Sequence, residues 1–173
     1  MTRQLVNYSG TIHNLGTTLS STLNWHDNTV KISKTVSRSL YQIRMSGDCF
    51  PLHVRKLLIE SLIMPNFDYC CLVYNDLTGE LGLRLERMLN ACVRFIFGVP
   101  LDSHNTPFYN KLEWLKLPNR RKYFLCITII SVTQSGRPGY LYGGFTFMSS
   151  VCSRALRADD LDLQIPIHNI LLL

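Results

Sequence analysis

The sequence predicts a mainly α-helical fold, in which a helical bundle follows a short N-terminal β-hairpin and precedes an irregular C-terminal tail. Of the 173 residues, 46% are hydrophobic and 17% are charged, a balance typical of a globular protein with a sizeable core. Residues 52–98 hold two amphipathic patterns on either side of Pro65. In the second pattern, apolar residues recur almost throughout at three or four positions, the spacing of one buried helix face. They are Leu81, Leu85, Met88, Leu89, Cys92, Val93, Ile96 and Phe97.

The N-terminal hairpin is expected within residues 4–24, which are rich in Thr, Ser, Asn and Gly. Ser9 and Gly10 form a plausible tight turn between two short strands. Because so small a strand pair is marginally stable by itself, we expect a helix or a further sheet to cover one of its faces.

A first helix is expected from about Trp25 to Met45, with Asp27 or Asn28 as its N-cap. Its apolar positions mark one face and are Val30, Val36, Leu40 and Ile43. Basic positions recur on another face at spacings of three and four, and are Lys31, Lys34 and Arg38. The basic face has two interpretations, a solvated helix surface or a row of contacts to phosphate groups.

A second helix is expected from Pro51, and Pro65 should stop or kink it. We expect leucines to form its buried side, namely Leu52, Leu57, Leu58 and Leu62. The bulky residues after the proline are expected in the core, with base stacking as the alternative. They are Phe67, Tyr69, Leu72, Val73 and Tyr74.

The long helix with the apolar stripe should start at Thr78 or Gly79 and end at Gly98. Three arginines lie close to one side of it, opposite much of the stripe, and form a second candidate row for phosphate contacts. They are Arg84, Arg87 and Arg94.

Two further helices are expected, a short one that opens at Pro107 and continues through Leu115, and a longer one after Pro118. The first turn of the longer helix is basic and holds Arg120, Arg121 and Lys122. Positive charge at a helix start opposes the helix dipole by roughly a few tenths of a kcal/mol per residue, so these charges are candidates for ligand contacts. From Tyr140 onward no periodicity is sustained, which predicts an irregular tail.

The net charge of +6 is unevenly distributed. Residues 1–46 carry a net charge of +4 and residues 116–137 carry +5, whereas residues 47–115 carry −2. Two basic blocks around a neutralised centre favour an anionic partner such as nucleic acid.

The six cysteines and five histidines are scattered without the spacing of a metal site, so we favour reduced structural thiols over a disulfide or a metal role. No Gly-rich phosphate loop, Ser/His/Asp order or Cys/His catalytic pattern is present. The N-terminus leads into no apolar stretch, and no run approaches the roughly 18 residues of a membrane span. We therefore expect an intracellular protein, cytoplasmic or nuclear, without a membrane partner.

A series of short segments over residues 5–166 has a recognisable order and spacing. The segments are His13-Asn14-Leu15-Gly16, Leu23-Asn24-Trp25, Leu62-Ile63-Met64-Pro65, Asp68-Tyr69, Leu85-Glu86-Arg87, Asn90, Arg94-Phe95-Ile96-Phe97-Gly98, Trp114-Leu115, Arg120-Arg121 and Pro138-Gly139-Tyr140-Leu141. Together they resemble the C-terminal part of the reverse transcriptase of non-LTR retrotransposons of the LINE type, most of all the jockey-like elements of arthropods.

The resemblance implies that residues 1–24 are a remnant of the primer-grip hairpin, with Leu15 and Gly16 within it. It implies a helical thumb over residues 25–100, connecting helices over residues 101–137 and an irregular tail over residues 138–173. The family enzyme is an RNA-directed DNA polymerase that uses magnesium and holds a template-primer duplex. Its fingers and palm, with the metal-binding aspartates, have no counterpart here, and neither has the family's usual continuation beyond Pro166, so the chain is expected to be cut at both ends.

One acidic segment, Arg157-Ala158-Asp159-Asp160, is similar to the family's aromatic-Ala-Asp-Asp hairpin only superficially. An arginine replaces the aromatic residue, and the family motif precedes the thumb in the chain. We interpret the segment as an acidic loop.

The function expected from the resemblance is weak, sequence-independent binding of RNA–DNA or other duplex nucleic acid, without polymerase catalysis and without a cofactor of its own. The residues expected to contact phosphates are Lys31, Lys34, Arg38, Arg84, Arg87, Arg94, Arg120, Arg121 and Lys122. The alternatives are a non-functional retroelement relic and a helical protein-interaction module. Such a module would use apolar residues that have lost their original cover, namely Leu5, Ile12, Leu15, Trp25 and Leu171 to Leu173.

Overall fold

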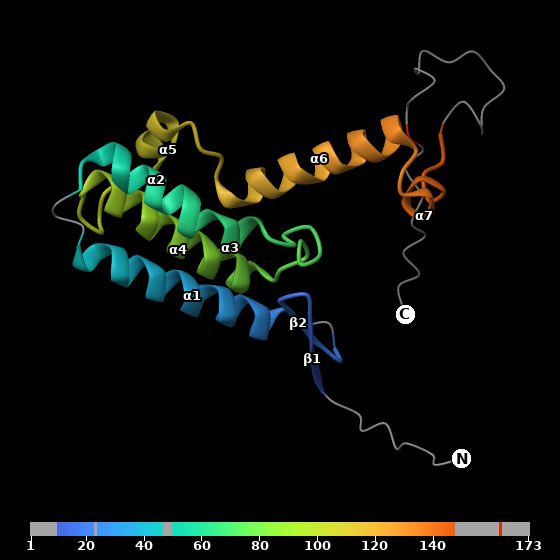
Figure 1. Ribbon diagram of the computed structural model, residues 1–173, viewed down its shortest axis with the longest axis horizontal. Helices are drawn as coiled ribbons and strands as arrows, with labels where there is room; N and C mark the ends of the chain where they lie inside the picture. The colour runs from blue at the N-terminus through green and yellow to red at the C-terminus, as the bar shows by residue number, and fades with distance from the viewer. Residues whose placement is uncertain (1–9, 23, 47–49, 148–162, 164–173) are drawn as a thin grey trace. The chain divides into compact units, whose positions relative to one another are not determined.

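The computed structural model describes residues 10–22, 24–46, 50–147 and 163. The chain forms two compact units, Met1–Phe124 and Leu125–Leu173. The fold is mainly helical with a short antiparallel hairpin, as predicted. In chain order the elements are β1 (Thr11–Asn14), β2 (Thr17–Ser20), α1 (His26–Met45), α2 (Leu52–Leu62), α3 (Met64–Asp68), α4 (Gly79–Phe97), α5 (Thr106–Leu112), α6 (Leu117–Ser135) and α7 (Gly139–Tyr142) (Figure 1).

The hairpin turns at Leu15 and Gly16, and the predicted turn at Ser9 and Gly10 is wrong. The strands pair so that two residues form the loop. Both have positive φ, 44° at Leu15 and 84° at Gly16, which a tight two-residue hairpin loop requires and which a glycine adopts readily. The carbonyl of Gly10 accepts a hydrogen bond from the N–H of Ser21 at 2.9 Å, so Gly10 lies at the open end of the hairpin. Ser9 lies outside the described residues.

Helix α1 covers the hairpin, and the small size of the hairpin predicted such a cover. The N–H of Thr18 donates to Oδ1 of Asn28 at 3.3 Å, and Asn28 is buried. Asn28 therefore holds the hairpin and does not cap the helix. The helix begins at His26, whose N–H donates to Oδ1 of Asn24 at 2.9 Å, and Asp27 lies within the first turn. The predicted cap is wrong because Asn28 is engaged by the sheet.

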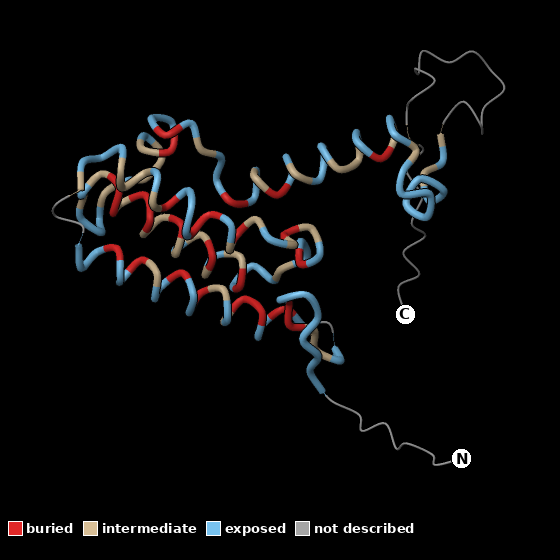
Figure 2. The backbone as a smooth tube through the Cα atoms, viewed as in Figure 1, coloured by how far each residue is buried: buried red, intermediate tan, exposed pale blue. Residues whose placement is uncertain are grey.

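Helices α1 and α4 and the α2–α3 segment lie side by side around the core of the first unit (Figure 1). Figure 2 shows that the buried residues recur along one side of these helices. Six of the eight residues of the predicted α4 stripe are buried, and Met88 and Phe97 are half-buried against the core. Gly98 ends the helix with φ of 63°, a left-handed C-cap. The largest fully buried side chains include Tyr74, Phe67, Ile59, Ile63, Leu85, Leu89, Ile96, Val36 and Val93.

The buried side of α2 is formed by Ile59 and continues with Ile63 directly after the helix. The predicted leucine face is wrong for three of its four members, whereas Leu58 is half-buried and packs against the core. Ile59 and Ile63 have no exposed surface, whereas Leu52, Leu57 and Leu62 are 49%, 62% and 53% exposed. Positions five apart on a helix point about 140° apart, so these three leucines cannot share one face. Ile59, Ile63 and Phe67 are four apart and continue one stripe from α2 into α3.

The residues after Pro65 divide between core and surface. Phe67 and Tyr74 are buried as predicted, and the Tyr74 hydroxyl donates to the Phe67 carbonyl at 3.0 Å. Tyr69 and Val73 are exposed, so the core prediction is wrong for them. They lie beyond α3, where the chain makes turns that a helical pattern does not describe.

Helix α5 ends earlier than predicted, because Glu113 adopts φ of 58° and closes it after Leu112. Trp114 then turns back, and its Nε1 donates to Glu60 at 3.0 Å. Helix α6 begins at Leu117, close to the predicted start.

The tail holds more local structure than predicted, because α7 begins at Gly139 and Phe147 pairs with Leu163 in an antiparallel bridge. The acidic segment with Asp159 and Asp160 lies outside the described residues. No helix among the described residues has the length and hydropathy needed to cross a membrane.

Candidate nucleic-acid interface

The basic face of α1 is exposed and lies opposite the face that packs in the core. Lys31, Lys34 and Arg38 are all exposed, whereas Val36 and Leu40 are buried. At 100° per residue, the basic and apolar sets are centred roughly half a turn apart. None of the three basic side chains forms an ion pair with a described residue. Their charges are therefore open to an anionic partner.

An open groove of about 430 Å³ lies beside this face, between α1 and the hairpin. It is lined by Thr11, His13, Thr18, Asp27, Val30, Lys31, Lys34, Thr35 and Arg38. One acidic side chain thus lines the groove against three basic ones. This balance gives the groove a positive potential, which suits phosphate groups.

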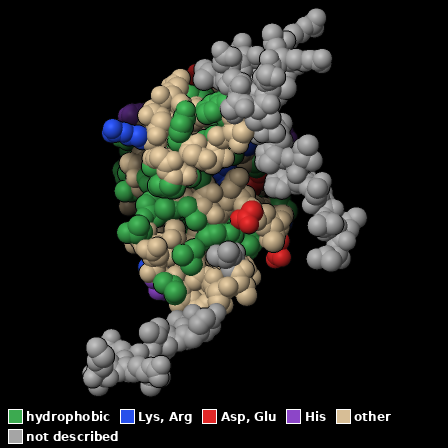
Figure 3. Space-filling view, turned by 90° about the vertical axis from the view of Figure 1, so that its right-hand side faces the viewer, with side chains coloured by type: hydrophobic (Ala, Val, Ile, Leu, Met, Phe, Trp, Pro, Cys, Tyr) green, Lys and Arg blue, Asp and Glu red, His purple; other side chains and the backbone are tan. Residues whose placement is uncertain are grey.

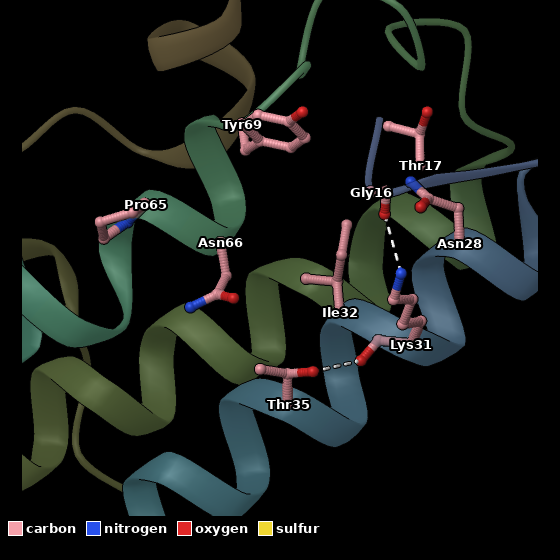
Figure 4. A pocket seen from close by; sticks show the side chains of 9 residues that line it. All are labelled: Gly16, Thr17, Asn28, Lys31, Ile32, Thr35, Pro65, Asn66 and Tyr69. Carbon is pink, nitrogen blue, oxygen red and sulfur yellow. Dashed lines mark hydrogen bonds between the residues drawn. The ribbon is translucent and has the colours of Figure 1, made fainter. Parts of the chain in front are cut away.

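Lys31 joins the basic face to the hairpin turn. Its Nζ donates to the carbonyl of Gly16 at 2.8 Å (Figure 4). From the other side, the hydroxyl of Tyr69 donates to the carbonyl of Leu15. Leu15 and Gly16, which the resemblance assigns to a primer grip, are therefore tied to α1 by Lys31 and to the end of α3 by Tyr69.

A second cavity, of about 280 Å³, lies between the turn, α1 and α3 (Figure 4). Lys31 lines it together with Asn66 and Thr35, so this lysine borders both cavities. Nδ2 of Asn28 is buried there without a hydrogen-bond partner among the described residues.

The arginines of α4 do not form an exposed row like that of α1. Arg87 is exposed, but Arg84 and Arg94 are half-buried. Arg94 lines a polar pocket of about 350 Å³ that also contains the carboxylates of Glu86 and Asp102. The loop before α5 borders this pocket and covers part of Arg94. Arg94 is therefore half-buried, although helical periodicity places it on the outer side of α4.

Arg120 is engaged inside the first unit. Its Nε and Nη2 donate to the two carboxylate oxygens of Asp68, each at 2.6 Å, and both side chains are about one quarter exposed. Its guanidinium also lies 5.3 Å from the centroid of the Phe124 ring. The hydrogen bonds that Arg120 donates to Asp68 raise the pKa of Arg120. Arg120 therefore forms an internal ion pair in place of the predicted phosphate contact.

Arg121 is buried, with 7% of its surface exposed, so it does not belong to an exposed basic row, and the phosphate contact predicted for it stays a prediction. Its guanidinium lies 5.2 Å from the centroid of the Tyr74 ring. Burial lowers the pKa of Arg121, and burial raises the pKa of Tyr74 to about 12. Lys122 alone of the three basic residues in this turn is exposed.

Like the ion pair of Arg120, two tryptophan hydrogen bonds join residues far apart in the chain. Trp25 Nε1 donates to Asp76 at 2.9 Å, and Trp114 Nε1 donates to Glu60. Asp68 and Arg120 are separated by 52 residues. No spacing in a single sequence signals pairs of this kind. In the part of the chain that the structure describes, no group of three His, Cys, Asp or Glu side chains could hold a metal ion.

Figure 3 shows one side of the space-filling structure. In its visible part, hydrophobic side chains gather, and Lys and Arg side chains are seen mainly at the edge. No protein-family model, curated protein or solved structure matches this chain.

Proposed function

We propose that this chain is a thumb-like part of a non-LTR retrotransposon reverse transcriptase, which holds duplex nucleic acid by phosphate contacts and performs no polymerase step by itself. The resemblance over residues 5–166 supports the family. The unpaired basic face of α1, with Lys31, Lys34 and Arg38, is the observation that supports the binding role.

The dimensions of this face suit a nucleic-acid backbone. From Lys31 to Arg38 the helix rises by about 10 Å, which corresponds to roughly three nucleotide steps of one strand at about 3.4 Å each. The contacts would go to phosphates, which carry no sequence information, so binding should be independent of sequence. Arg120 and Arg121 do not line the groove beside the basic face of α1. Magnesium and its aspartate ligands would belong to a palm outside this chain.

Fluorescence anisotropy with labelled DNA and RNA–DNA duplexes of unrelated sequence tests the proposal. Three phosphate contacts predict a log-log salt slope of about −2.7 for duplex DNA between about 50 and 200 mM salt. All sequences should give the same affinity at a given salt concentration. Binding that does not change with salt, or the absence of binding at the low-salt end, would contradict the proposal.

A protein-interaction module is the second candidate, because Ile12 and Leu15 of the hairpin are 60% and 82% exposed. Trp25, another residue of the predicted apolar patch, is buried, so that part of the prediction is wrong. The remaining members of the patch, Leu5 and Leu171 to Leu173, lie outside the described residues. Strictly monomeric sedimentation together with no binding of an apolar dye would exclude this candidate.

A further inference from the structure

The first turns of α4 and α6, both within the first unit, border one groove of about 510 Å³. The start of α4 contributes Thr78, Gly79 and Gly82, and the start of α6 contributes Leu117 and Pro118. Each helix has 19 residues, and the aligned peptide dipoles place partial positive charge at its N-terminus. Two such ends at one groove favour an anionic occupant.

The first turn of α4 offers a backbone donor to this groove, the N–H of Gly79. Thr78 makes no capping hydrogen bond with its side chain, and the first backbone bond of the helix runs from the N–H of Gly82 to Thr78. The N–H groups of Gly79, Glu80 and Leu81 have no acceptor among the described residues. No atom lies within 4 Å of the position that a Cβ would take at Gly79 or Gly82, so the space beside this turn is open.

Arg121 provides the second, independent observation. It lines the groove and is 7% exposed, yet its Nε and Nη2 have no hydrogen-bond partner in the described part of the chain. The nearby carboxylate of Asp68 is occupied by Arg120. The ring of Tyr74 stabilises the guanidinium but does not neutralise it. Arg121 forms no ion pair with a described residue, and Glu86 is the acidic side chain that shares the groove with it. A buried charge without a direct partner is costly, so a site of this kind favours a bound anion.

Lys122 adds a second positive charge to the lining, and Glu86 is the one acidic side chain that opposes it. The free N–H of Gly79 and the two cations match a phosphate group better than a carboxylate, because a phosphate offers several acceptor oxygens and carries one negative charge as a diester and up to two as a monoester or free ion.

We propose that the groove between the N-termini of α4 and α6 is a phosphate-binding site. The phosphate oxygens accept hydrogen bonds from the first turn of α4, while Arg121 and Lys122 supply the positive charge. The phosphate is either a free ion or monoester, or a group of a nucleic-acid backbone. The site does not depend on the function proposed above for α1, because it shares no residue with the groove beside Lys31.

Titration of the ¹⁵N-labelled chain with inorganic phosphate, against potassium chloride at equal ionic strength, tests the site. We expect saturable shifts of the backbone amide signals of Gly79 and Gly82 with phosphate and none with chloride. Arg121→Met should weaken phosphate binding by roughly tenfold or more, the loss expected for one charge-assisted contact. Lys111→Gln, which removes an exposed charge on α5, should leave it unchanged. Shifts that do not saturate, or that persist equally in Arg121→Met, would overturn the site.

Lys122→Glu provides a second variant in case Arg121→Met does not fold, because the Lys122 side chain is exposed. Reversal of its charge should also weaken phosphate binding by about tenfold or more, and unchanged binding would overturn the site. Duplex affinity measured on the same variant identifies the source of the phosphate. A parallel loss of duplex affinity assigns the site to the nucleic-acid backbone, and unchanged duplex affinity assigns it to a free phosphate or monoester.

Discussion

Breaking the ion pair between Asp68 and Arg120 should destabilise the first unit and leave nucleic-acid binding intact. The pair joins the end of α3 to the first turn of α6 by two hydrogen bonds of 2.6 Å. Because Arg120 is held by this carboxylate, it contributes to folding and not to phosphate contacts. A binding role and a structural role for Arg120 therefore predict different results.

The structure sets the expected magnitude. A charge-assisted hydrogen bond contributes about 1.5–3 kcal/mol when shielded, and the exposure of one quarter of each side chain places this pair near the lower end. We expect Asp68→Ala to lower the free energy of unfolding by about 2 kcal/mol. Arg120→Ala should cost about 0.5 kcal/mol more, since the contact with the Phe124 ring is also lost. The coupling energy in the double-mutant cycle should be about 1–2 kcal/mol.

Urea unfolding followed by tryptophan fluorescence measures this loss, because both tryptophans of the chain, Trp25 and Trp114, lie in the first unit. With a slope of about 2 kcal/mol per molar urea, the midpoint should fall by about 1 M for either single variant. The salt slope of duplex binding should not change. Additive single-mutant effects, or a salt slope reduced by about one unit in Arg120→Ala, would refute the reasoning.

Three further predictions concern the core, the hairpin and the response to pH. Ile59→Ala should cost about 2–4 kcal/mol in urea unfolding because it leaves a cavity, whereas Leu57→Ala on the exposed side of α2 should change stability by less than about 0.5 kcal/mol. Leu15→Asn should raise the free energy of unfolding by roughly 0.5 kcal/mol, because asparagine tolerates the positive φ of this turn better than leucine; a loss of stability in thermal unfolding would contradict that account. Burial raises the pKa of Cys92 from 9.0 to about 12 and that of Tyr74 from 10.0 to about 12. Both groups therefore stay protonated to a higher pH in the folded state than in the unfolded state. Stability should therefore fall as pH rises from about 9 towards 12, by at most about 1.4 kcal/mol per pH unit for each group, and Cys92→Ala should flatten the first part of this decline.

Local patterns in the sequence predicted the elements that depend on local rules. The stripe of α4 and its closure at Gly98 follow from three- and four-residue spacing and from the left-handed preference of glycine, and both are confirmed. The leucine face of α2 was predicted from residue type without regard to angle. Spacing of five places Leu57 and Leu62 on different sides, so the core selected Ile59 and Ile63.

The basic residues illustrate what a single sequence does not reveal. Periodicity placed Lys31, Lys34 and Arg38 on the outer face of α1, and the structure leaves them exposed. The same reasoning failed for Arg120 and Arg121, because their partners lie in a turn region far away in the chain. Whether a charge at a helix start faces solvent depends on what packs over that turn, and local spacing carries no information about that.

The most direct test of the central claim measures how duplex binding depends on salt in a variant whose α1 face has lost its positive charges. This variant replaces Lys31, Lys34 and Arg38 with glutamine. A control of equal net charge replaces Lys56, Lys111 and Arg137 with glutamine instead. The α1 variant should lose about 2.7 units of the log-log salt slope, while the control keeps the slope of the unmodified chain. Equal slopes in the two variants would contradict the claim that α1 holds the nucleic-acid backbone.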